Sequence, residues 1–106
     1  MNIDLDIDSL SPDQFKKFQA VDIREPEECE AFAPRTKNIA FIPLSQADKK
    51  MDYFKTNHSY LLVCAKGGRS HYLAEILQSK GIHALSVNHG MASFNQYLEE
   101  NGYADS

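Results

Sequence analysis

One short segment of this chain combines a cysteine with glycines and basic side chains, a combination suited to nucleophilic chemistry. Residues 64–70 read Cys-Ala-Lys-Gly-Gly-Arg-Ser. Thiolate is the nucleophilic form of cysteine, and neighbouring Lys or Arg side chains stabilise it. Glycine permits positive φ and a close approach of the backbone to a bound anion, which a Cβ would resist. The segment therefore predicts a reactive thiolate at Cys64.

The elements around this segment should place Cys64 at the end of a buried strand. Residues 60–63, Tyr-Leu-Leu-Val, form a continuous apolar run that is typical of a central strand in a parallel sheet. Apolar residues at helical spacing follow the glycines up to Gly81, which we expect to end a helix. A strand, a turn and a helix in this order aim the N–H groups of about residues 65–70 at one point and form an anion site.

The rest of the chain alternates short strands with helices. Apolar runs predict strands at residues 3–7, 20–23, 39–42 and 84–87, and start signals predict helices from Ser11, Pro26, Ser45 and Gly90. The helix from Ser45 should reach about Phe54, and the tail after Asn101 should be frayed. The alternation predicts one α/β domain over residues 1–106, with a mainly parallel central sheet and helices on both faces. Such sheets place ligands beyond the carboxyl ends of their strands.

Composition excludes several classes of protein. The chain of 106 residues is 42% hydrophobic and 25% charged, which is ordinary for one globular domain. No apolar run approaches the roughly 20 residues that span a bilayer, and the N-terminus is acidic where a secretory signal is basic, so we expect no membrane partner and a cytoplasmic location. The net charge of −4 argues against nucleic acid. We interpret both cysteines as free thiols. Eleven of the fifteen acidic residues fall in residues 1–52, so Cys64 lies in the more positive part of the chain.

The spacing between Cys64 and Arg69 separates two chemistries. A phosphatase signature has five residues between cysteine and arginine, giving a loop that surrounds a tetrahedral phosphate. Here four residues intervene, and the smaller loop suits a cysteine that carries one extra sulfur. The segment resembles the active-site loop of the rhodanese family, Cys-x-x-Gly-x-Arg, matched by Cys64, Gly67 and Arg69 and followed by Ser70.

Further segments carry the same resemblance. Residues 21–26 are similar to the family's Asp-x-Arg-Glu-Pro, residues 42–44 to its Ile-Pro-Leu, and residues 89–94 to its Gly-Gly-x-x-x-Trp, with Phe94 in place of tryptophan. The family's Gly-His-Ile-x-Gly-Ala is absent before Ile-Pro-Leu, where this chain has the segment Ala33–Asn38. The resemblance therefore covers most of the chain and leaves substrate preference open.

The resemblance implies a rhodanese-like sulfurtransferase of the thiosulfate type. Cys64 would be the catalytic residue. Its sulfur would take the outer sulfur atom of a donor, either thiosulfate or a persulfide, and so become a persulfide itself. A thiol or cyanide would then accept this sulfur, and a small redox protein is a candidate acceptor. No metal or organic cofactor is expected. The substrate-binding residues would be Ala65, Lys66, Gly67, Gly68, Arg69 and Ser70.

Two other functions remain as alternatives. One is a non-catalytic rhodanese-like module that recognises a partner protein, suggested by the altered segment Ala33–Asn38. The complete loop around Cys64 counts against it, because a binding module needs no thiolate. The other is a phosphatase or arsenate reductase, for which the five-residue spacing is missing.

Several polar residues allow both a functional and a structural interpretation. Arg69 either contacts substrate or ties the loop to an acidic partner, for which Asp22 and Glu25 are candidates. Asp22 and Arg24 are better explained as a structural pair that orients loops.

The sequence gives less reason to assign a functional role to the second cysteine or to the histidines. Cys29 lies among carboxylates that should raise its pKa, so we interpret it as structural. The four histidines are spread along the chain without the close pairing that zinc ligands show. His71, one turn into the predicted helix, is the histidine that could approach the mouth of the site.

Overall fold

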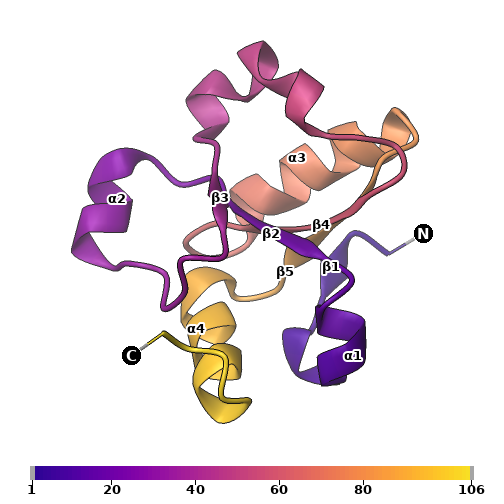
Figure 1. Cartoon of the computed structure of the whole chain (residues 1–106). Coiled ribbons are helices and arrows are strands. Elements are labelled where there is room, and N and C mark those ends of the chain that lie inside the picture. Colours follow the sequence, from indigo (N-terminus) through magenta and orange to yellow (C-terminus); the bar gives the residue numbers. More distant parts are fainter. Residues whose placement is uncertain (1, 106) are drawn as a thin grey trace.

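A five-stranded parallel sheet forms the centre of the molecule in the computed structural model, which describes residues 2–105 (Figure 1). The strand order is β1-β5-β4-β2-β3, and every neighbouring pair is parallel. The strands are β1 Asp4–Leu5, β2 Gln19–Asp22, β3 Ala40–Phe41, β4 Ser59–Val63 and β5 His83–Val87. The predicted α/β fold is confirmed, and β4 takes the central place that its apolar run predicted.

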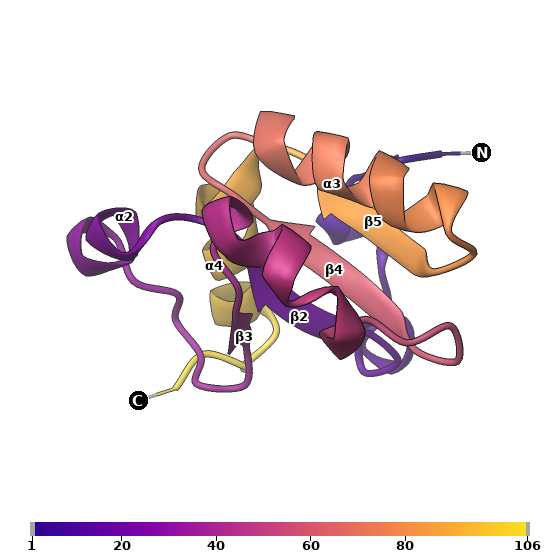
Figure 2. The ribbon, with the colours of Figure 1, turned by 90° about the horizontal axis from the view of Figure 1, so that it is seen from above.

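Helices cover both faces of the sheet (Figure 2). One face packs against α3 (Gly68–Ser79) and two 3₁₀ segments, Leu44–Lys49 and Met51–Tyr53. The other face packs against α4 (Gly90–Glu100), the 3₁₀ turn Ile7–Ser9 and α1 (Pro12–Phe15). The short helix α2 (Pro26–Ala31) buries none of its residues and stands to the side of the sheet. No helix among residues 2–105 has the length and apolarity needed to cross a membrane.

Local sequence signals explain where two of these helices begin. The hydroxyl of Ser11 accepts a hydrogen bond from the N–H of Gln14 at 3.2 Å, and the Gln14 side chain accepts one from the N–H of Ser11 at 2.8 Å. This reciprocal cap satisfies donors that a helix start leaves free. In α2, Pro26 occupies the first turn, and the Glu28 carboxylate accepts the N–H of Glu25 at 3.1 Å. Both starts were predicted correctly.

The helix predicted from Ser45 to Phe54 does not form. Two 3₁₀ segments replace it, broken at Lys50, where φ is −121°. Ser45 caps no helix, because its hydroxyl and its N–H both donate to the Glu25 carboxylate, at 2.8 and 3.4 Å. The prediction was wrong because a partner 20 residues away takes the side chain that would have capped the helix.

The predicted frayed tail is packed over residues 102–105, and the last residue of the tail lies outside the described residues. The ring of Tyr103 stacks on that of Phe15 with centroids 5.4 Å apart. The N–H of Asp105 donates to the carbonyl of Arg35 at 2.8 Å, and the Asp105 carboxylate accepts the N–H of Lys37 at 2.6 Å. The tail therefore holds part of the atypical segment Ala33–Asn38 in place, which the sequence pattern near the C-terminus did not indicate.

Candidate functional site

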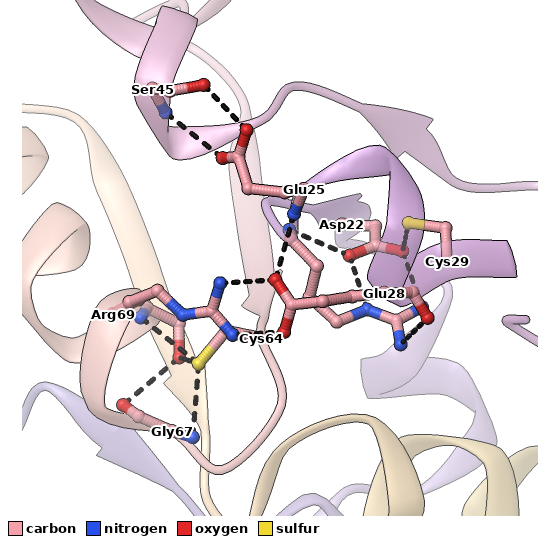
Figure 3. Close-up of polar contacts among 10 residues, drawn as sticks. Asp22, Glu25, Glu28, Cys29, Ser45, Cys64, Gly67 and Arg69 are labelled. Carbon is pink, nitrogen blue, oxygen red and sulfur yellow. Dashed lines mark hydrogen bonds and ion pairs between the residues drawn. The ribbon is translucent and has the colours of Figure 1, made fainter. Parts of the chain in front are cut away.

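Cys64 follows β4 at the carboxyl edge of the sheet and lies at the base of the loop. Its residue is 1% exposed, whereas Ala65, Lys66 and Gly68 are exposed. The sulfur accepts the N–H of Gly67 at 3.1 Å and that of Ser70 at 3.4 Å (Figure 3). Two N–H groups of the segment thus meet at the sulfur atom.

These contacts change the acidity of the thiol. Burial would raise the pKa of Cys64, but the hydroxyl of Ser70 and the N–H groups of Ser70, Gly67 and Lys66 outweigh it and hold this pKa below its usual range. The Ser70 hydroxyl lies 3.3 Å from the sulfur. The arrangement therefore favours a thiolate at Cys64, the form that attacks electrophilic sulfur.

The two glycines of the loop differ in what they contribute. Gly67 has φ +107° and precedes α3, so its left-handed backbone turns the chain from the strand into the helix. Gly68 is the first residue of α3 and has no positive φ, and a Cβ there would meet nothing within 4 Å. Of the two glycines that the sequence offered for positive φ, Gly67 therefore uses this freedom and Gly68 does not.

Arg69 is held by an acidic partner, and that partner is Glu28. The guanidinium donates to both carboxylate oxygens of Glu28, at 2.6 and 2.7 Å (Figure 3). This pairing lowers the pKa of Glu28 to about 2. The two candidates from the sequence are engaged elsewhere, because Asp22 binds Arg24 and Glu25 binds Ser45. The ion pair between Arg69 and Glu28 joins the N-terminal turn of α3 to α2, because Glu28 lies in the first turn of α2.

Asp22 and Arg24 form a buried structural pair, as interpreted. Both side chains are 2% exposed, and the guanidinium donates to the two carboxylate oxygens at 3.0 and 2.9 Å. Arg24 also donates to the carbonyl of Glu28 at 3.3 Å. Burial disfavours the charged guanidinium, yet Asp22 more than offsets this and raises the pKa of Arg24. The pair therefore ties the end of β2 to the helix that carries Glu28.

The second thiol, that of Cys29, is held in its protonated form. Cys29 is half-buried, and its S–H donates to the Asp22 carboxylate at 3.3 Å (Figure 3). Burial, followed by this hydrogen bond, raises the pKa of Cys29 to about 11. The structural interpretation of Cys29 is supported, although burial contributes more than the carboxylates that suggested it.

Two residues that sequence reasoning did not single out support the loop from behind. A Cβ on Gly90 would lie 2.2 Å from the carbonyl oxygen of Ala65, and the N–H of Met91 donates to the carbonyl of Cys64 at 2.8 Å. The hydroxyl of Ser86, on β5, lies 2.5 Å from that of Ser70. Two features of the sequence could have indicated these contacts: Gly90 stands at the start of a helix, and Ser86 is a lone serine within an apolar strand.

The side chain of His71 is turned away from Cys64. His71 contacts Asp4 at 2.9 Å and Glu75 at 3.1 Å, so its ring is directed to β1 and along its own helix. The side chain of Asp4 chiefly accounts for the raised pKa of His71. Within residues 2–105, no three His, Cys, Asp or Glu side chains are grouped as a metal ion would require.

Known structures share this fold and define its class. A rhodanese-like domain protein from Staphylococcus aureus is 31% identical, with a TM-score of 0.67, over 77% of this chain and 85% of that one. A rhodanese-related protein from Thermoplasma volcanium is 28% identical, with a TM-score of 0.69, over 86% of this chain and 85% of that one. No family model matches the chain, and no curated protein matches it either.

The chain belongs to the rhodanese-like domain family. Domains of this fold also occur within larger redox enzymes. An NAD-dependent persulfide reductase from A. fulgidus has one that is 22% identical, with a TM-score of 0.64, matching 88% of this chain and 15% of that one. At 22% identity, the similarity to this reductase shows only that the fold is shared.

Proposed function

We propose that this protein is a sulfurtransferase that carries a sulfane sulfur on Cys64 as a persulfide. The observation that carries the proposal is that the N–H groups of Gly67 and Ser70 are directed at the Cys64 sulfur, at 3.1 and 3.4 Å, a geometry that lowers the pKa of this thiol. A structural cysteine at a strand end needs no such donors. Membership of the rhodanese-like family is consistent with this chemistry.

The transfer would take place in two displacements. The Cys64 thiolate attacks the outer sulfur of thiosulfate, the S–S bond of the donor breaks, and sulfite leaves with the electron pair. A thiolate or cyanide acceptor then attacks the outer sulfur of the persulfide, and the Cys64 thiolate leaves. The same N–H groups stabilise the anionic sulfur before and after each displacement. Neither step requires a metal or an organic cofactor.

The surroundings of Cys64 suit a donor that presents a single terminal sulfur atom. The sulfur of Cys64 lies at the base of a loop whose outer residues are exposed. We propose that residues 65–70 receive the donor, with Lys66 as the attracting cation, because Arg69 is already paired with Glu28. The physiological donor would then be thiosulfate or a persulfide, and the acceptor a thiol, including that of a small redox protein. A reducing compartment such as the cytoplasm would keep both thiols free.

The proposal is tested by following the mass of the Cys64 peptide. Protein incubated with thiosulfate should gain one sulfur atom on Cys64 and lose it to cyanide or to a thiol. Cys64→Ser should gain none, and the matched control Cys29→Ser should behave as the unmodified protein, because Cys29 is protonated at neutral pH. If neither thiosulfate nor a persulfide donor loads Cys64, the proposal is wrong and a non-catalytic interaction module becomes the better explanation.

A further inference from the structure

A buried pair of hydroxyl groups lies behind Cys64, and one of the two, that of Ser86, has no role in the chemistry described above. Ser70, in the first turn of α3, and Ser86, on β5, are both 0% exposed. Ser86 shares the face of β5 with Ala84, which packs into the apolar cluster under α3. A buried hydroxyl is costly unless it is hydrogen-bonded, so the partners of these two groups determine their role.

The hydrogen bonds form a chain that ends at the reactive sulfur. The Ser86 oxygen lies 2.5 Å from the Ser70 oxygen, which in turn lies 3.3 Å from the sulfur of Cys64. Both hydroxyls also lie 3.2 Å from the carbonyl oxygen of Gly67. Ser86 does not contact the sulfur and acts on it through Ser70.

Each hydroxyl has one proton, and counting these protons gives two complete arrangements. With Cys64 as thiol, its S–H donates to Ser70, Ser70 donates to Ser86, and Ser86 donates to the Gly67 carbonyl. With Cys64 as thiolate, the direction reverses, so that Ser86 donates to Ser70 and Ser70 donates to the sulfur. The Gly67 carbonyl stays satisfied in the second arrangement, because it accepts the N–H of His71 at 3.0 Å. Apart from the proton that the thiol loses, only the rotation of the two hydroxyl protons separates the arrangements.

We propose that Ser86 is a positioning residue that directs the hydroxyl proton of Ser70 onto the Cys64 sulfur. Without Ser86, the Ser70 proton has the Gly67 carbonyl and the sulfur as competing acceptors at nearly equal distances, 3.2 and 3.3 Å. A donor on the Ser70 oxygen also polarises its O–H bond, which strengthens the bond to the thiolate. The inference rests on the proposed function in one respect, namely that the Cys64 thiolate serves sulfur transfer.

The test is the pH profile of Cys64 alkylation by iodoacetamide, followed on the Cys64 peptide by mass spectrometry. The ratio of the rate at pH 7 to the high-pH plateau measures the thiolate fraction independently of access. Ser86→Ala should lower this ratio about three- to tenfold, which is the change that the loss of one hydrogen bond to the thiolate would produce. In a Ser70→Ala background, the same change should alter the ratio by no more than about twofold, because its route to the sulfur is gone. Ser59→Ala is the control and should leave the profile unchanged, because it removes a hydroxyl that is bonded to His83 at the opposite end of β4 from Cys64.

A second comparison covers the case in which Ser86→Ala fails to fold. Ser86→Thr and Ser86→Val have nearly the same shape and differ in the hydroxyl, so the Thr variant should keep a higher thiolate fraction than the Val variant. Equal effects of Ser86→Ala with and without Ser70, or equal profiles for Thr and Val, would overturn the inference. Alkylation needs no sulfur donor, so failure to form a persulfide would refute the proposed function and leave the role of Ser86 standing.

Discussion

Replacing Gly90 with alanine should damage the Cys64 loop from behind. Gly90 has φ +70°, and a Cβ there would lie 2.2 Å from the carbonyl oxygen and 2.4 Å from the carbonyl carbon of Ala65. Ordinary van der Waals separation is about 3.5 Å, so the loop backbone or the start of α4 must shift by about 1 Å. Both atoms belong to the backbone, which cannot swing away as a side chain can.

The expected cost has two parts that a control separates. Positive φ at a residue with a Cβ costs about 1–2 kcal/mol, and overpacking a tight contact costs about 1–3 kcal/mol more. Gly102 has nearly the same φ, +72°, and a Cβ there meets nothing within 4 Å. Gly102→Ala should therefore lose only the first part, and Gly90→Ala the sum, about 2–5 kcal/mol of the free energy of unfolding.

Two measurements compare these variants. Denaturant unfolding gives the difference in free energy, and the pH profile of Cys64 alkylation reports on the donors at the sulfur. Gly90→Ala should move the midpoint of this profile upward, because a shifted loop withdraws the N–H groups of Gly67 and Ser70, whereas Gly102→Ala should not. Equal losses of stability in the two variants, together with unmoved profiles, would refute the close packing of Gly90 on the loop.

Three further outcomes follow from the pairing of charges and thiols. Glu28→Gln should cost about 1 kcal/mol at pH 7, since about a third of each paired side chain is exposed, and this difference should be complete above pH 4.5 and shrink as the pH falls through about 2, where the Glu28 carboxyl becomes protonated in the folded protein. A difference in denaturant unfolding that is as large at pH 2 as at pH 7 would contradict it. Cys29, with its pKa raised to about 11, should remain unalkylated at pH 8 while Cys64 reacts, as site-resolved mass spectrometry can check. Lys66→Ala should weaken apparent binding of thiosulfate and leave alkylation by neutral iodoacetamide within about twofold, because exposed charges are screened; an equal loss in both assays would argue against its role in attracting the donor.

The parts of the fold with a strong local pattern were predictable from the sequence. The run 60–63 is apolar at every position and became the central strand, and the glycine turn before α3 led to the predicted order of strand, turn and helix. These features depend on residues close together in the chain. Local propensity and packing agree there, which is why the position of Cys64 could be inferred.

The misjudged parts depend on partners far away in the chain. The partner of Arg69 lies 41 residues before it, and the side chain expected to cap a helix at Ser45 is taken by Glu25, 20 residues before it. The tail after Asn101 is expected to fray because chain termini usually do, but Tyr103 stacks on Phe15 of α1. Local patterns show that an acidic or aromatic residue is available, but only the fold decides which one is used.

The pairing of Arg69 changes how the thiolate should be explained. From the sequence, Lys66 and Arg69 seemed to supply the positive charge that stabilises it. Arg69 is paired with Glu28 and Lys66 is exposed, so the largest part of the stabilisation comes from uncharged donors within hydrogen-bonding distance of the sulfur, with a smaller electrostatic contribution from Arg69. Such donors keep their strength in salt and need their exact orientation, unlike a surface charge. If Cys64 acts as proposed, its reactivity should therefore depend on the backing of the loop by Gly90 and Ser86 more than on the charges of Lys66 and Arg69.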